Sequence, residues 1–108
     1  MVSVEIENVI IHYLWQVTAM GIPISKAIVY GSQARGDAKL LSDIDLVLVS
    51  REFEPPLDRR VVRKLWELRA KADSRIEPIA CGEKEWATDD HRVILEIARR
   101  EGVAIPWS

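Results

Sequence analysis

Two short apolar segments on either side of a glycine turn constrain this chain more than any other feature. Residues 26–30 and 44–50 are rich in β-branched and other apolar residues. Both are too short for typical helices, so each predicts a strand. The second segment is apolar almost throughout, as expected for a strand that is covered on both faces. Gly31 follows the first segment, where a glycine allows a tight turn.

Two aspartates stand at the head of the second segment. Asp43 and Asp45 are two positions apart, so in extended chain they project from the same face, separated by roughly 6.5–7 Å along the strand. Two carboxylates at this spacing can converge on one divalent cation. Upstream, Gly31 and Ser32 can offer backbone N–H groups and a hydroxyl to a phosphate. A metal site beside a phosphate site indicates nucleotide chemistry.

The joint pattern, Gly31-Ser32-Gln33-Ala34-Arg35-Gly36 followed by Ser42-Asp43-Ile44-Asp45-Leu46, resembles the DNA polymerase β-type nucleotidyltransferases, in particular their minimal nucleotidyltransferase domains. The resemblance implies an α/β (α+β) fold: a small mixed sheet with helices mainly on one face. It implies one domain over residues 1–108. The implied reaction is the Mg²⁺-dependent transfer of AMP from ATP to a hydroxyl group, with release of pyrophosphate.

The resemblance also assigns the catalytic carboxylates. Asp43 and Asp45 correspond to the family's metal ligands, which hold two Mg²⁺ ions. The family places a third carboxylate on the strand that follows the second long helix, where this chain has Glu77. That residue would bind metal or take the proton of the acceptor hydroxyl. Many minimal members have Asp at this position, and Asp73 is the alternative.

The nucleotide-binding residues implied by the resemblance are Gly31, Ser32, Arg35 and Ser42. Arg35 has two possible roles. It can point towards the phosphates of a bound nucleotide, or it can hold its own loop by hydrogen bonds to carbonyl groups. Residues 32–35 are predicted to form a helical turn, and residues 37–41 are predicted to form a loop.

From the length of this chain we expect no further domain that would bind an acceptor. Minimal nucleotidyltransferases of this size resemble the antitoxins of toxin–antitoxin pairs whose toxin is a HEPN-type ribonuclease. The implied activity is then adenylylation of that partner on a hydroxyl. Two alternatives stay open: a binding module that inhibits its partner by contact alone, and a subunit of an aminoglycoside-type transferase. A homo-oligomer is also possible.

Composition narrows the function classes. The 108 residues carry a net charge of −2, with a sequence pI near 5.7. Proteins that mainly hold nucleic acid usually have a basic excess, so strong nucleic-acid binding is not expected. The sequence has no apolar run long enough for a membrane span, and its one cysteine, Cys81, cannot form an internal disulfide. We therefore expect a cytoplasmic protein.

The remaining patterns predict three helices and one strand. Apolar periodicity favours helices over residues 4–20 and 57–72, the second with a buried stripe that includes Leu57 and Trp66. Its basic residues could face RNA, an acidic partner or solvent. Residues 75–80 predict a strand at a sheet edge, because Pro78 has no N–H to donate. A last helix would be capped by Thr88 or Asp89, and the apolar tail at 103–107 would pack on the body or on another subunit.

Overall fold

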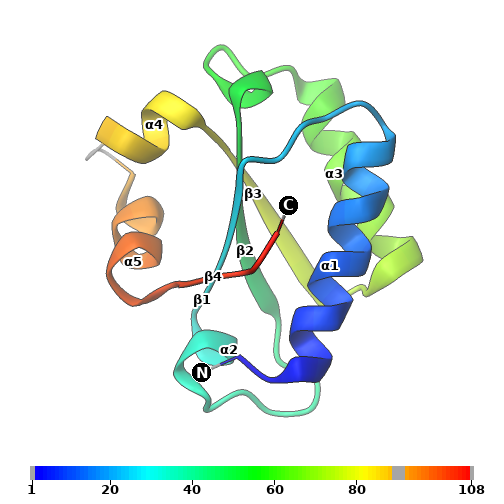
Figure 1. Cartoon of the computed structure of the whole chain (residues 1–108), viewed down its shortest axis with the longest axis vertical. Helices are drawn as coiled ribbons and strands as arrows, with labels where there is room; N and C mark the ends of the chain where they lie inside the picture. The colour runs from blue at the N-terminus through cyan, green and yellow to red at the C-terminus, as the bar shows by residue number, and fades with distance from the viewer. Residues whose placement is uncertain (1, 89–91, 108) are drawn as a thin grey trace.

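The computed structural model describes residues 2–88 and 92–107, and its centre is a four-stranded sheet (Figure 1). The strand order is β3-β2-β1-β4. Strand β1 runs antiparallel to β2 and to β4, whereas β2 and β3 are parallel. The predicted mixed sheet is confirmed. The strands are β1 (Lys26–Tyr30), β2 (Ile44–Ser50), β3 (Ile76–Gly82) and β4 (Val103–Ala104).

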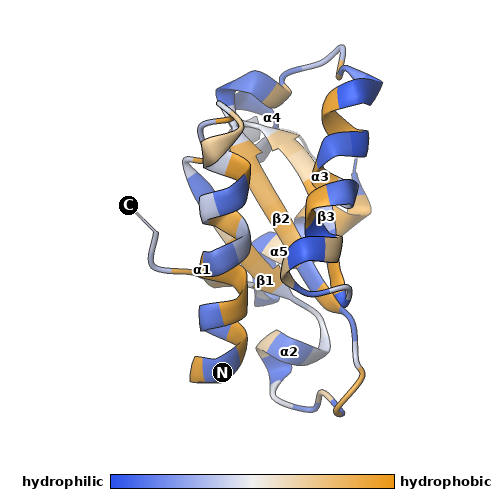
Figure 2. Ribbon diagram, turned by 90° about the vertical axis from the view of Figure 1, so that its right-hand side faces the viewer, coloured by the Kyte–Doolittle hydropathy of each residue, from blue (hydrophilic) through white to orange (hydrophobic). Residues whose placement is uncertain are grey.

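Helices cover both faces of the sheet (Figures 1 and 2). The two long ones, α1 and α3, lie together on one face, as predicted, and the shorter α4 and α5 form a thinner layer on the other face. None of the described helices is both long and apolar enough to cross a membrane. The helical segments are α1 (Val4–Ala19), α2 (Ser32–Arg35), the 3-10 turn η1 (Arg51–Phe53), α3 (Arg59–Ala72), α4 (Glu83–Thr88) and α5 (Val93–Glu101).

The alternation of side chains along β2 divides the interior into two cores. Leu46 and Leu48 belong to the core beneath α1 and α3, whereas Val47 and Val49 belong to the core beneath α5. Tyr13 of α1 lies in the first core, where its hydroxyl donates a hydrogen bond of 2.7 Å to the carbonyl of Leu65 in α3. Strand β2 is therefore apolar because both of its faces are covered, as predicted.

Helix α3 begins two residues later than predicted. Asp58 caps it, because its carboxylate accepts a hydrogen bond of 2.8 Å from the backbone N–H of Arg60. Leu57 therefore precedes the helix and is 36% exposed, and Trp66 is 38% exposed, so neither belongs to the buried stripe. The guanidinium of Arg69 lies over the Trp66 ring at 4.5 Å and covers part of it.

Two predictions about the sheet edges are confirmed. Strand β3 is an edge strand, which is compatible with Pro78 because a proline has no N–H to donate on the open side. The C-terminal tail packs on the body: the backbone N–H of Ile105 donates a hydrogen bond of 2.9 Å to Ala27 beside the short pairing of β4 with β1. The sequence left open whether this tail packs on its own chain, and it does.

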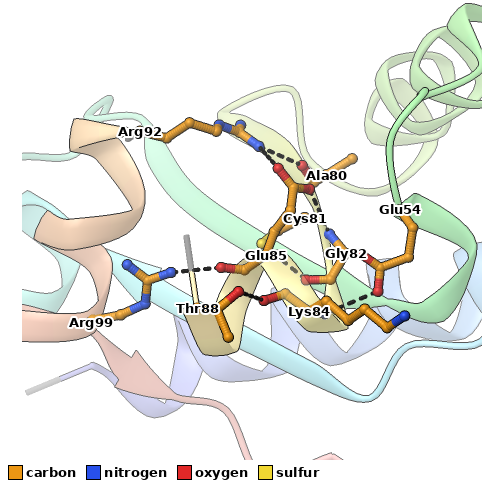
Figure 3. Close-up of polar contacts among 9 residues, drawn as sticks. All are labelled: Glu54, Ala80, Cys81, Gly82, Lys84, Glu85, Thr88, Arg92 and Arg99. Atoms are coloured by element: carbon orange, nitrogen blue, oxygen red, sulfur yellow. Dashed lines mark hydrogen bonds and ion pairs between the residues drawn. The ribbon is translucent and has the colours of Figure 1, made fainter. Parts of the chain in front are cut away.

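The prediction of one last helix is wrong. The structure has two, and Thr88 ends α4 instead of capping α5, whose N-cap residue is Arg92. Asp89, the other predicted cap, lies outside the described residues. Figure 3 shows what holds α4: Glu85 accepts a hydrogen bond of 2.9 Å from the N–H of Gly82, and Arg99 of α5 donates to the carbonyl of Glu85 at 2.8 Å. Helix α4 was not predicted because the contact that holds it against α5 joins residues far apart in sequence, and such a contact leaves no local pattern.

Candidate active site

The three predicted carboxylates come from the beginnings of two neighbouring parallel strands. Asp45 of β2 and Glu77 of β3 are register partners, so their side chains stand beside each other on one face of the sheet. Asp43 precedes Asp45 by two positions. Because Asp45 alternates in phase with Val47, this is the face that α4 and α5 cover further along the strands. Asp43 is exposed, and Asp45 and Glu77 are half-buried.

Gly31 closes over this face at the end of β1. It has a φ of 73°, a conformation that side-chain-bearing residues rarely adopt. A Cβ atom at this position would lie 2.5 Å from Oδ2 of Asp45, so the missing side chain leaves room for the carboxylate. Tyr30, which precedes Gly31, is the antiparallel partner of Asp45. The glycine turn and the Asp45 carboxylate are therefore built against each other.

The crowding of acidic groups changes their titration. Burial raises the pKa of Asp45 above its usual value, and repulsion from Asp43 raises it further, while Arg35 acts in the opposite direction. Burial likewise raises the pKa of Glu77, with added effects from Asp43 and Asp45, against the lowering effect of Arg69. Asp43 thus makes ionisation of Asp45 and Glu77 less favourable, and Asp45 has the same effect on Glu77.

The donor set has the chemistry of a Mg²⁺ site, since it consists of carboxylate oxygens and the repulsion among them would be relieved by a cation. Within residues 2–88 and 92–107, however, no three acidic, histidine or cysteine side chains already converge on one position that could hold a metal ion. A cation bound here would therefore need further oxygen ligands from another molecule, such as the phosphates of a nucleotide.

The predicted nucleotide-binding segment forms the short helix α2 and the loop after it. Its backbone is folded on itself: the N–H groups of Gly36 and Asp37 both donate to the carbonyl of Ser32. The hydroxyl of Ser42 accepts a hydrogen bond of 2.8 Å from the N–H of Lys39. Ser42 therefore closes the loop that leads into Asp43, and Ser32 stands at the start of α2 beside the glycine turn.

Among the described residues, Arg35 does not make the predicted hydrogen bonds to loop carbonyls. Its Nε donates to the carboxylate of Asp37 and its Nη1 to that of Glu101 in α5, both at 3.3 Å. These contacts link α2 to the end of α5, although Glu101 is 66 positions away in sequence. The predicted bonds to loop carbonyls are therefore replaced by pairs with carboxylates. Arg35 still lies close enough to Asp45 to lower the pKa of that carboxyl.

Asp73, the alternative third carboxylate, is engaged elsewhere. It forms an ion pair of 2.7 Å with Arg75 and also accepts hydrogen bonds from the Arg75 backbone and from Nε. This pairing holds the pKa of Asp73 below its usual range, the side-chain hydrogen bond being the largest cause. The structure therefore places Glu77, and not Asp73, beside Asp45.

Two residues near the carboxylates were missed by the sequence analysis. Gln33 of α2 is 7% exposed and donates a hydrogen bond of 3.4 Å to the carbonyl of Ser42, which joins α2 to the approach to Asp43. Tyr30 is buried, and burial together with Asp45 and Glu77 raises the pKa of its phenol to about 12. The sequence signal that could have pointed to Gln33 is its polar side chain between Gly31 and Gly36. Tyr30 gives no such signal, because an aromatic residue is ordinary in a strand.

Two hollows lie outside the carboxylate cluster. A cavity of about 280 Å³ lies at the other end of β1 and is lined by residues that include Lys26, Trp86, Arg99 and Trp107. A second, of about 230 Å³, is lined by Ser3, Gln33, Gly36 and Ala38 and borders the loop that follows α2. The carboxylates line neither of them.

Comparison with known proteins gives a consistent result. The family model described as a nucleotidyltransferase domain matches residues 15–100. A crystal structure of a candidate nucleotidyltransferase from Sulfolobus solfataricus is similar with a TM-score of 0.64 and 16% identity, over 94% of this chain and 79% of that one. A toxin–antitoxin structure with AMP-PNP is similar with a TM-score of 0.61 and 17% identity, over 90% of this chain and 73% of that one. At these identities the two structures show the shared fold. No curated protein sequence matches the chain.

Proposed function

This chain belongs to the nucleotidyltransferase domain family, and we propose that it transfers the AMP moiety of ATP to a hydroxyl group of a partner protein. The observation that carries the proposal is the register that sets Asp45 beside Glu77, with Asp43 two positions before Asp45. These residues are our proposed catalytic set. Gly31, Ser32, Arg35 and Ser42 are the proposed nucleotide-binding residues.

Asp43, Asp45 and Glu77 would hold the Mg²⁺ that the family uses. When bound, the metal supplies charge neutralisation on the triphosphate and on the leaving pyrophosphate. The like-charge crowding of the carboxylates supports this assignment, because a group of half-buried acids without a cation is costly. The phosphates would complete a ligand set that the protein leaves incomplete.

The protein's own groups account for the remaining chemistry. The acceptor hydroxyl oxygen attacks the α-phosphorus, the bond to the bridging oxygen breaks, and pyrophosphate leaves. The hydroxyl proton must go to a nearby base. As the alternative to holding the metal, Glu77 would take this proton, because its side chain stands beside Asp45 at the site. The missing side chain of Gly31 leaves room for the Asp45 carboxylate.

A toxin–antitoxin pair is the setting that we propose. The similar fold of a toxin–antitoxin structure with AMP-PNP supports both an adenine nucleotide as donor and a protein partner. The partner of this chain would be a HEPN-type ribonuclease, as the sequence resemblance implies, silenced by adenylylation in the cytoplasm, where ATP is available.

The experiment is incubation with α-labelled ATP and Mg²⁺, with and without the protein encoded beside this chain, followed by intact mass measurement. We expect the partner to gain whole AMP units with the wild-type chain. No gain is expected with Asp43→Asn, and the wild-type gain is expected with the control Glu52→Gln, an exposed carboxylate beyond the far end of β2. A wild-type reaction without any mass gain on the partner would contradict the proposal.

A contact-only antitoxin is the second candidate. One observation favours it: Arg35 is paired with Asp37 and Glu101, and these pairs would have to open before it could bind phosphate. In that case the partner would be inhibited in a stable complex without ATP, and Asp43→Asn would inhibit as well as the wild type. Ribonuclease activity of the partner, measured with and without ATP, separates the two candidates.

A further inference from the structure

The loop between α2 and β2 presents two leucines to solvent at the edge of the carboxylate cluster. Leu40 is 85% exposed and Leu41 is 82% exposed, the highest fractions among the large apolar side chains in the described part of the chain. They directly precede Ser42 and Asp43. We call residues 37–41 the leucine loop. Isolated exposed leucines are ordinary, but two adjacent ones beside a reactive site are a candidate contact surface.

Several hydrogen bonds hold the leucine loop in place. Arg75, which is paired with Asp73, donates a hydrogen bond of 3.0 Å from Nη1 to the carbonyl of Leu40. The N–H of Lys39 donates to the Ser42 hydroxyl at 2.8 Å, and the N–H of Ser42 donates to the carbonyl of Lys39 at 3.1 Å. The loop is thus fastened to the beginnings of β2 and β3. A molecule that contacts the leucines would be held at a defined distance from the carboxylates.

The surroundings of the loop indicate the kind of molecule. The hollow of about 230 Å³ that Ala38 helps to line offers room for a protruding side chain. Lys39 adds one positive charge to the loop, whereas Arg35 and Arg75 are already paired with acids. With the paired acids and arginines left out of the count, three carboxylates, Asp43, Asp45 and Glu77, stand against two cations, Lys39 and Arg69, at this edge of the described structure.

From these features we infer that the leucine loop is the surface on which the acceptor protein docks, through an apolar patch flanked by lysine or arginine residues. This inference rests on the proposed function and deepens it, because it assigns the recognition of the acceptor to Leu40 and Leu41. Apolar burial supplies the contact, and the acidic surroundings supply charge complementarity. The loop sets the acceptor hydroxyl beside the carboxylates.

A nucleic-acid or small-molecule acceptor fits this surface less well. A phosphate backbone would be repelled by the carboxylates, and aliphatic leucines offer no ring for bases to stack on. A small molecule needs an enclosing pocket, whereas both leucines project into solvent. A protein with its own folded surface can cover them.

The test measures binding separately from transfer. The probe is the protein encoded beside this chain, titrated by calorimetry without nucleotide against the full chain and against the double variant Leu40→Ser, Leu41→Ser. Val93→Ser is the matched control, because Val93 is 73% exposed on α5. We expect the double variant to weaken the Kd at least about tenfold, which is about 1.4 kcal/mol, with the control unchanged. Wild-type binding should also weaken as salt is raised.

The outcomes distinguish this inference from the proposed function. A weakened Kd for the double variant alone, with its melting temperature and ATP binding kept, supports docking through the loop. The same loss of binding, in a system where the wild type transfers no AMP, supports docking and rejects the transferase. Equal binding by the wild type and the double variant overturns the inference, even where AMP transfer is observed. The absence of any wild-type complex also overturns it.

Discussion

The backbone of Gly31 and the carboxylate of Asp45 occupy adjoining space, so that a Cβ atom on residue 31 would lie 2.5 Å from Oδ2 of Asp45. The two residues are 14 positions apart and meet because the end of β1 pairs with the beginning of β2. Position 31 therefore requires glycine for two reasons: its φ is positive, at 73°, and a side chain there would clash with Asp45. These requirements can be separated experimentally.

Gly31→Ala should abolish AMP transfer, and it should lower stability more than Gly36→Ala does. The matched control is Gly36→Ala: Gly36 has a φ of 87°, but a Cβ added there would meet no heavy atom of the described residues within 4 Å beyond its chain neighbours. Gly36→Ala should lose about 1–2 kcal/mol of unfolding free energy, because a left-handed L-residue is strained. Gly31→Ala should lose more than that, because its φ of 73° with a ψ of −151° is a conformation open almost only to glycine. Only Gly31→Ala should displace the Asp45 carboxylate. Urea unfolding and the labelling assay check this, and equal activity of the two variants would contradict it.

Asp45→Asn should lower the transfer rate by at least about 100-fold. Loss of a residue that only hydrogen-bonds to a metal ligand typically costs about 10–100-fold, and loss of the ligand itself should cost no less. Its stability should be equal to that of the wild type or higher. The raised pKa of Asp45 means that folding disfavours its charged form at neutral pH, and asparagine carries no charge. The labelling assay and urea unfolding at pH 7 measure the two quantities.

The same variant tests the metal assignment without any activity measurement. Mg²⁺ with a non-hydrolysable ATP analogue should raise the melting temperature of the wild type by binding to the folded state, and should raise that of Asp45→Asn much less. Glu52→Gln serves as the control. Equal shifts for the wild type and Asp45→Asn would remove Asp45 from the metal site.

Arg35→Ala should weaken ATP binding and change the free energy of unfolding by less than about 1 kcal/mol, because its two ion pairs are half-exposed and such pairs contribute little. The reason for weaker binding is the loss of positive charge close to Asp45. Calorimetric titration of ATP and chemical unfolding measure the two quantities. A large loss of stability with unchanged ATP affinity would show that Arg35 only joins α2 to α5.

The Asp73–Arg75 pair should make stability depend on pH. The folded pKa of Asp73 is lowered, so its contribution is fully present above the unfolded value of about 3.9 and is lost as the pH falls through the folded value. Asp73→Asn should therefore cost roughly 1–3 kcal/mol at pH 7, and the difference from the wild type should shrink in strong acid. Urea unfolding of the wild type and Asp73→Asn at pH 7 and in strong acid measures this. The same stability difference under both conditions would contradict the prediction.

Local sequence determined the elements around the site. The predicted boundaries of β1, α2 and β2 agree with the structure, because apolar strand residues, the glycine and the Ser-Asp-Ile-Asp pattern act over short distances. Pro78 marked an edge strand for an equally local reason, the missing N–H. The family could be recognised from the same motifs.

Tertiary structure decided what crosses between elements. The parallel register that sets Asp45 beside Glu77, the pairing of Arg35 with Glu101 and the separate helix α4 all depend on contacts between segments far apart in the chain. A linear pattern does not contain these distances, since the energy of each contact arises only when the sheet has brought both partners together. The sequence could name the reactive residues, whereas the packing of two strands and a glycine turn determined which of them stand side by side.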